Sequence, residues 1–87
     1  TTYTTTNADG VISVDATSAS FTVTLVSAVG NSGLTQTFKK INAANVVTID
    51  ANSTQTIDGV TTYALSARYS WVTVISDGAN WMITGAG

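Results

Sequence analysis

Short stretches in which apolar and polar side chains alternate recur along the chain. Residues 21–26 alternate most cleanly, with Phe21 and Val23 predicted on one face of a strand and the intervening threonines on the other. The Asn-Ala-Asp-Gly segment at 7–10 and the Asp-Gly pairs at 58–59 and 77–78 are turn signals between such stretches. The same pattern predicts further strands at residues 11–14, 34–41, 46–49, 55–57, 62–65, 70–76 and 80–84.

This succession of short strands predicts an all-β fold, namely a small antiparallel β-sandwich or barrel-like domain of about eight strands. Residues 20–84 are expected to form the β-module. They follow an N-terminal arm or linker with one short strand at 1–19 and precede a flexible tail at 85–87. One irregularity is expected inside the module. Phe38 and Ile41 are three residues apart, so a β-bulge at Lys39 and Lys40 is predicted to turn both apolar side chains inward.

Composition strengthens the β prediction and adds an expectation of assembly. Valine, isoleucine and threonine supply 10, 6 and 17 of the 87 residues, and β-branched side chains suit a pleated surface. Charged residues make up 9% of the chain, far below the ~25% of ordinary soluble domains. Lone β-domains commonly protect their sheet edges with lysine, glutamate or proline, and this chain has two lysines and neither of the others. We therefore expect other copies of the chain to cover part of the surface in an oligomer.

The same composition excludes several classes of function. Histidine and cysteine are absent, which removes zinc sites, disulfide scaffolds, thiol nucleophiles and histidine-based acid–base catalysis. Three basic residues cannot neutralise a nucleic-acid backbone, and no apolar run approaches the ~20 residues of a membrane-spanning helix. A catalytic pair of Asp50 and Asp58 is disfavoured because aspartates at strand ends are typical of turns. A calcium loop at 50–54 lacks the glycine and the late glutamate that such a site needs. We expect no enzyme activity, no metal and no cofactor.

The aromatic side chains supply the candidate interface residues. Trp71 is out of phase with Val72 and Val74 in one predicted strand. If the valines face inward, Trp71 and Ile75 face outward. An outward stripe of this kind is typical of a subunit interface, so we assign Trp71 and Ile75 to one, together with Tyr3 in the N-terminal segment.

The second half of the chain contains a more specific motif. It consists of Ser-Asp-Gly-x-Asn-Trp at 76–81, with Ile-Asp-Gly at 57–59 and Val-Thr-Ile-Asp at 47–50 upstream. With Tyr-Ala-Leu at 63–65, Tyr69, Val-Thr-Val-Ile at 72–75 and the strand at 37–41, these stretches resemble a small β-module of tailed-bacteriophage virion proteins. The resemblance covers roughly residues 20–83. It implies a non-enzymatic structural domain, often trimeric, in an extracellular fibre or virion appendage.

Three functions fit these observations. The first is a structural or assembly module of a phage virion (a tail fibre, a tail spike or a capsid decoration). Its expected partners are further copies in a trimer and other virion proteins. The second is a carbohydrate- or receptor-binding module of such a fibre, in which Tyr63 and Tyr69 are the candidates for contacting a host surface glycan. The third is a subunit of a bacterial or archaeal surface filament, in which residues 1–6 add as a strand to the open sheet edge of a neighbour. No nucleic-acid partner and no membrane insertion are expected.

Overall fold

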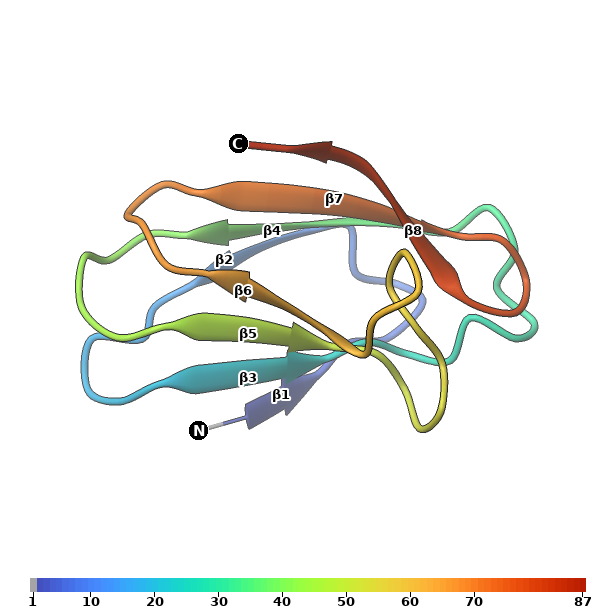
Figure 1. Cartoon of the computed structure of the whole chain (residues 1–87), viewed down its shortest axis with the longest axis horizontal. Coiled ribbons are helices and arrows are strands. Elements are labelled where there is room, and N and C mark those ends of the chain that lie inside the picture. Colours follow the sequence, from blue (N-terminus) through green and yellow to red (C-terminus); the bar gives the residue numbers. More distant parts are fainter. Residues whose placement is uncertain (1) are drawn as a thin grey trace.

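The computed structural model describes residues 2–87, which form eight short strands and no helix (Figure 1). The strands are β1 (Thr2–Thr4), β2 (Val11–Val14), β3 (Phe21–Thr24), β4 (Thr35–Lys40), β5 (Val47–Asp50), β6 (Thr62–Leu65), β7 (Trp71–Ser76) and β8 (Trp81–Ala86). The predictions of an all-β fold and of about eight strands are confirmed. The strand predicted at 55–57 does not form, and Ile57 makes only isolated bridges. None of the described residues belongs to a helix long and apolar enough to cross a membrane.

The eight strands are divided between two mixed four-stranded sheets. The first sheet has the order β1-β3-β5-β6 and the second sheet the order β2-β4-β7-β8. The β1–β3, β3–β5 and β2–β4 pairs are parallel, and the β5–β6, β4–β7 and β7–β8 pairs are antiparallel. The prediction of an antiparallel fold is therefore wrong for half of the pairs. The first five strands alternate between the two sheets. Between β1 and β3, for example, the chain passes through β2 of the second sheet, so β3 runs parallel to β1. The same alternation makes β2 parallel to β4 and β3 parallel to β5.

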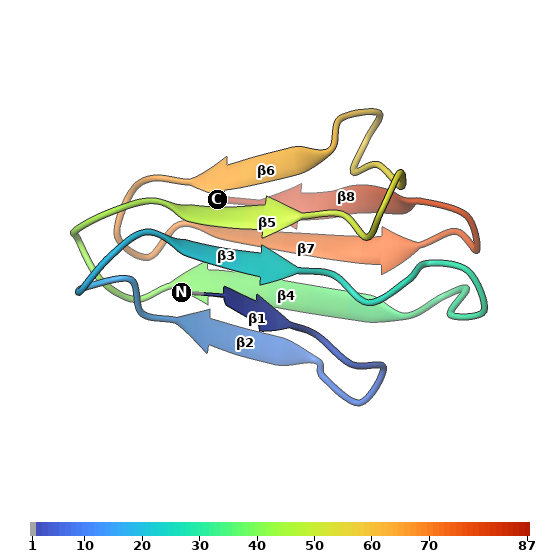
Figure 2. The same ribbon diagram turned by 90° about the horizontal axis from the view of Figure 1, so that it is seen from below.

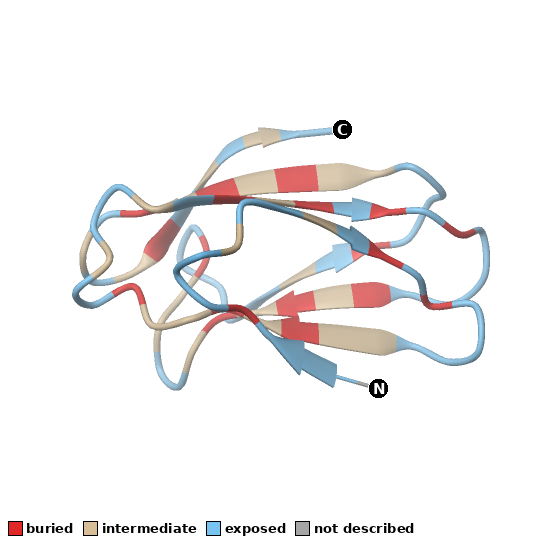
Figure 3. Ribbon diagram, turned by 180° about the vertical axis from the view of Figure 1, so that it is seen from behind, coloured by how far each residue is buried: buried red, intermediate tan, exposed pale blue. Residues whose placement is uncertain are grey.

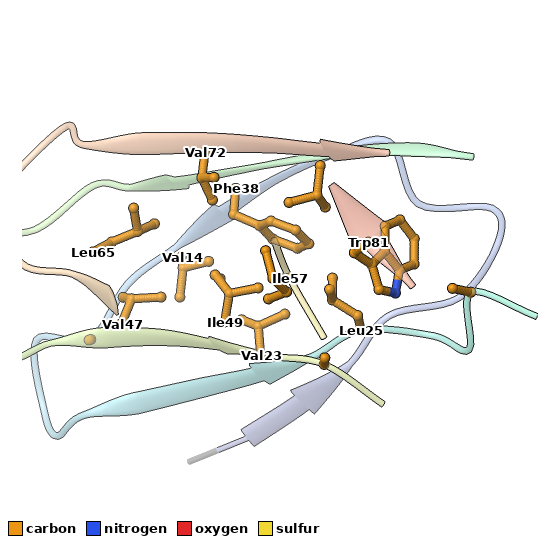
Figure 4. Close-up of a cluster of buried hydrophobic side chains, with 14 residues drawn as sticks. Val14, Val23, Leu25, Phe38, Val47, Ile49, Ile57, Leu65, Val72 and Trp81 are labelled. Carbon is orange, nitrogen blue, oxygen red and sulfur yellow. The ribbon is translucent and has the colours of Figure 1, made fainter. Parts of the chain in front are cut away.

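The hydrophobic core lies between the two sheets (Figures 1 and 4). Burial alternates along the strands, as the banded colouring of Figure 3 shows, because successive side chains point to opposite faces of a sheet. Val23 and Ile49 reach the core from the first sheet, and Phe38, Val72 and Val74 reach it from the second.

Both ends of the described chain belong to the sheets, contrary to expectation. Residues 1–19 were predicted to be an arm or linker with one strand, but they supply two strands, β1 and β2, one to each sheet. Thr5, just after β1, is buried, and its hydroxyl donates a hydrogen bond to Gln36 Oε1 at 2.9 Å. Of the flexible tail predicted at 85–87, Gly85 and Ala86 instead belong to β8, and the backbone of Gly87, just after the strand, exchanges hydrogen bonds of 2.9 and 3.0 Å with Trp71.

The bulge predicted at Lys39 and Lys40 is absent, because β4 alternates without interruption. Phe38 and Lys40 both point inward and are 0% exposed, whereas Ile41 is exposed. The alkyl stem of a lysine can fill a core position if its ammonium group finds an acceptor. Here Lys40 Nζ donates a hydrogen bond to the backbone carbonyl of Asn42 at 2.6 Å. The irregularity of the second sheet lies elsewhere, as a register shift between β7 and β8.

Candidate assembly surfaces

The motif at 76–81 forms the connection between β7 and β8, and its polar side chains hold that connection together. Asp77 Oδ1 accepts hydrogen bonds from the backbone N–H groups of Asn80 (2.8 Å) and Ala79 (2.9 Å). Gly78 has a φ of 96°, in the left-handed region that favours glycine. The backbone hydrogen bond from Asn80, followed by that from Ala79, lowers the pKa of the Asp77 carboxyl group below its ordinary value. The carboxylate therefore has a structural role in this turn.

The rest of the motif joins this turn to the β5–β6 connection. Asn80 Oδ1 accepts a hydrogen bond from the Thr56 N–H at 3.0 Å, and the Trp81 N–H donates to the Thr56 carbonyl at 2.8 Å. Asp58 donates its N–H to the Trp81 carbonyl at 3.0 Å, and its Oδ1 accepts from the Ile83 N–H at 3.1 Å. The indole of Trp81 is buried in the core (Figure 4). The separate Ile-Asp-Gly and Ser-Asp-Gly-x-Asn-Trp segments are thus parts of one structural unit.

Strand β7 has one side toward the core and one side toward the exterior. Val72 and Val74 are buried, and Trp71 and Ile75 alternate with them on the outer side, as the sequence pattern predicts. Ile75 is paired with Met82 of β8, which is exposed. We call Trp71, Ile75 and Met82 the outer apolar face of the second sheet.

Trp71 is half-buried within a single chain because its ring lies against two glycines of the β8 end. A Cβ atom on Gly87 would overlap Trp71 Nε1, and one on Gly85 would lie 3.1 Å from Trp71 Cη2. The absence of side chains at these two positions leaves the space that the indole occupies. Sequence reasoning missed this contact, although a Gly-x-Gly segment directly after an alternating strand was a usable signal for it.

Tyr3 belongs to a different surface, since it lies on the edge strand β1 of the first sheet. Its hydroxyl donates a hydrogen bond to Asp9 Oδ2 at 2.9 Å, and this bond is the main cause that raises the pKa of Tyr3. The pKa of Asp9 is lowered, first by the Thr6 backbone N–H and then by Tyr3. The structure brings Trp71 and Ile75 together on one strand and does not bring Tyr3 to them.

Tyr3 lines an apolar groove on the side of the molecule where the edge strands β1 and β2 lie. The groove has a volume of about 310 Å³ and is also lined by Ile12 and Val14 of β2 and by Phe21 and Val23 of β3. These are inward-facing side chains of both sheets, so the groove is the open border of the core. Sequence reasoning missed it because the groove depends on which strands lie at the sheet edges, and the alternation pattern carries no such information.

The two tyrosines predicted as ligand candidates have different surroundings. Tyr63 of β6 is half-buried and packs against the core. Tyr69 lies in the β6–β7 connection with a φ of 66° and is 55% exposed. Two cations lie over its ring, with Arg68 Cζ 4.8 Å and Lys39 Nζ 5.7 Å from the ring centroid.

The aspartates lie at strand ends and in the connections between strands. Among residues 2–87, no three histidine, cysteine, aspartate or glutamate side chains are grouped so that they could hold a metal ion. Asp50 lies beside Thr24 and Thr62 in the first sheet, and Asp58 is engaged with the Ile83 backbone. The two aspartates considered as a pair thus have separate neighbours.

No family model matches the chain, and a search of curated proteins finds no significant relative.

Proposed function

We propose that the chain is a non-enzymatic structural module of an extracellular fibre or phage virion appendage, in which it assembles with copies of itself as a trimer. In this proposal the two sheets form a β-sandwich whose exterior is completed by neighbouring copies and by other proteins of the same particle.

The outer apolar face of the second sheet is the observation that carries the proposal. No further layer of this chain lies over that sheet among the described residues (Figure 1). Thr35, Thr37 and Thr73 share that outer side with the apolar residues. The strands of the first sheet differ in having no large apolar residue on their outer side, where most positions are threonine: Thr2, Thr4, Thr22, Thr24, Thr48 and Thr62. Large apolar side chains on one outer side of the molecule, with a polar surface on the opposite side, are typical of a face that another subunit covers. The net charge of −2 opposes contact between identical copies only weakly.

The resemblance over residues 20–83 supports placing this module in a fibre or virion. The residues that carry the resemblance include Asp58, Asp77, Asn80 and Trp81, and they hold a turn, a loop and a core side chain in place. A motif of this kind is a signature of a fold, which favours a structural role over a catalytic one.

Light scattering on the purified chain tests the proposal. We expect a mass close to three times 8.9 kDa at micromolar concentration. Trp71→Ala should shift the mass toward that of the monomer while cooperative unfolding is retained. Trp81→Phe is the matched control, since it alters a buried tryptophan and should leave the mass unchanged. A monomeric wild-type chain, or a Trp71→Ala variant of full mass, would contradict the proposal.

Strand donation into a filament is the competing mode of assembly, and a disulfide distinguishes it. Thr4 of β1 and Thr24 of β3 are direct partners in the first sheet. In a Thr4→Cys, Thr24→Cys variant, oxidation joins whichever β1 and β3 strands are paired. A trimer built through the outer apolar face should give the disulfide within each chain and run as a monomer on non-reducing denaturing electrophoresis, whereas a filament in which β1 pairs with another copy should give covalently linked multimers.

Recognition of a host surface glycan is a second candidate function, favoured by the exposed Tyr69 ring and its neighbouring cations. A screen of neutral and carboxylated saccharides at millimolar concentration tests it. Tyr69→Ala should abolish any binding found, and Tyr63→Phe should not, because Tyr63 packs against the core.

A further inference from the structure

The carboxylates are concentrated at one end of the long axis of the molecule. This axis measures 34 Å, against 24 and 22 Å for the other two. Asp50 is the last residue of β5, and three other aspartates lie in the β1–β2, β5–β6 and β7–β8 connections. The strand directions place these positions at the same end (Figure 2). This acidic end holds four of the five carboxylates, namely Asp9, Asp50, Asp58 and Asp77.

The three basic residues of the chain all lie at the opposite end. Lys39 and Lys40 are the last two residues of β4, and Arg68 lies in the β6–β7 connection. Lys40 is buried and its ammonium group is bonded to the Asn42 carbonyl, so Lys39 and Arg68 supply the exposed positive charge of this end. Lys39 and Arg68 both lie over the ring of Tyr69, which ties the two segments together. Asp15, directly after β2, is the one aspartate at this basic end.

Each end also exposes apolar side chains beside its charges. Val29, Val60 and Met82 are exposed at the acidic end, and Ile41, Val46 and Tyr69 are exposed at the basic end. Apolar groups within a charged rim are a common composition for a protein contact. The two ends are thus of similar make-up and of opposite charge.

We propose that the acidic end of one copy docks on the basic end of a second copy, so that copies stack along the long axis. This contact rests on the proposed assembly function and adds a longitudinal interface to the lateral one. Because the two contacting surfaces differ, it is a heterologous interface that can repeat without closing, as a fibre requires.

The contact between two single modules is weak on physical grounds. Exposed ion pairs contribute little individually and are screened by salt. The cross-section of 24 × 22 Å offers less than the roughly 800 Å² per partner that a standard interface buries. Three such contacts made together by stacked trimers raise the effective affinity greatly without any new interaction. Longitudinal growth is therefore expected to depend on lateral assembly and on ionic strength.

Sedimentation velocity of the untagged 87-residue chain tests the proposal, since Thr2 and Gly87 both lie at the basic end (Figure 1), where a tag would obstruct it. At about 20 mM salt we expect species larger than the lateral oligomer, and at about 500 mM salt we expect a roughly tenfold weaker stacking affinity.

Substitutions that neutralise carboxylates at one end or the other test which ends form the contact. Asp50→Asn, Asp58→Asn and Asp77→Asn combined remove charge from the acidic end while keeping an acceptor oxygen at each position, and should weaken stacking by about tenfold. Asp15→Asn removes a carboxylate from the basic end and should leave stacking unchanged or stronger. Non-specific association predicts a different result, because both variants bring the net charge of −2 closer to neutrality and both should then associate more.

The outcomes separate this proposal from the proposed function. An oligomer of fixed mass at every salt concentration overturns the end-to-end contact and leaves lateral assembly intact. The end-to-end contact is also overturned if the variant with all three aspartates replaced still forms species larger than the lateral oligomer at low salt. A monomer under all conditions overturns both, whereas growth that is lost in the triple variant and retained with Asp15→Asn supports the end-to-end contact.

Discussion

The two sides of the second sheet carry the same residue types in opposite surroundings. Trp81 and Lys40 point toward the core and are 1% and 0% exposed, whereas Trp71 and Lys39 point outward from β7 and β4. On the inner side, tryptophan fills the core and lysine bonds the carbonyl of Asn42. On the outer side, the indole lies against backbone glycines and the lysine lies over an aromatic ring.

The position of a side chain along a strand therefore determines its role more than its chemical type does. A shift of one residue moves a side chain from one face of a sheet to the other. Inner tryptophan and lysine are therefore expected to set the stability of the fold, and outer tryptophan to set assembly. The following variants test that division, beginning with the largest expected effect.

Substitution of the two tryptophans should give clearly different losses of stability. Trp81→Ala removes a fully buried indole and should lower the free energy of unfolding by about 3–5 kcal/mol. Trp71→Ala removes a half-buried indole and should cost about 1 kcal/mol. Urea unfolding of both variants measures the difference. Equal losses would contradict the division between an inner side for folding and an outer side for assembly.

Trp81→Phe refines this prediction. Trp81 Nε1 is buried and has no hydrogen-bond partner among the described residues. Phenylalanine loses volume but also removes the unpaired N–H donor, so the loss should be smaller, about 1–2 kcal/mol.

The two adjacent lysines should differ in the same direction. Lys40→Ala leaves a cavity in the core and should cost about 2 kcal/mol, whereas Lys39→Ala should change stability by less than about 0.5 kcal/mol. Lys40→Met fills the same space without a buried charge and should be as stable as the wild type or more stable. If Lys40→Met is as damaging as Lys40→Ala, then the hydrogen bond to Asn42, and not the packing of the alkyl stem, is what stabilises the fold at this position.

Much of the fold could be predicted from the sequence because alternation with period two is a local property. The inward valines and outward Trp71 and Ile75 of β7 follow directly from it. The burial of Lys40 could not be predicted. Hydrophobicity favours Ile41 for the core, but the alternation of side chains along β4 turns Lys40 inward and leaves Ile41 exposed. Gly85 and Gly87 were predicted as a tail because glycine has no side chain that could show alternation.

The arrangement of the strands in space could not be predicted from the same pattern. Parallel and antiparallel strands alternate in the same way, so the parallel pairing of β1, β3 and β5 left no signal in the sequence. The groove beside Tyr3 and the separation of charge between the two ends depend on this pairing. The turn chemistry of the Asp-Gly pairs was predictable, but the hydrogen bond that joins Asp58 to Ile83 is a contact between separate segments.

Addition of a methyl group at Gly87 tests how Trp71 is held on the outer side. The new Cβ atom would overlap Trp71 Nε1, so either the indole or the backbone at Gly87 must move. In a Trp81→Phe background, Trp71 is the only tryptophan, and Gly87→Ala should shift its emission to longer wavelength. The cost in stability should be below about 1 kcal/mol, because residues at a chain end fray easily. Gly10→Ala is the control, since nothing lies within 4 Å of the added atom. Unchanged emission would show that the glycines do not shape the outer apolar face.

The smallest effect is expected at the turn that leads into the inner tryptophan. The backbone N–H of Asn80, and after it that of Ala79, lowers the pKa of Asp77 in the folded chain, so folding favours the charged carboxylate. Its stabilising contribution is complete above the unfolded pKa of about 3.9 and is lost as the pH falls through the folded pKa. Asp77→Asn keeps an acceptor oxygen without the charge, so its stability should fall less than that of the wild type between about pH 5 and pH 2. Asp77→Ala removes the acceptor and should be less stable than Asp77→Asn at every pH. Thermal unfolding across this range measures both effects, and parallel curves for the wild type and Asp77→Asn would show that the charge of Asp77 contributes nothing to the turn.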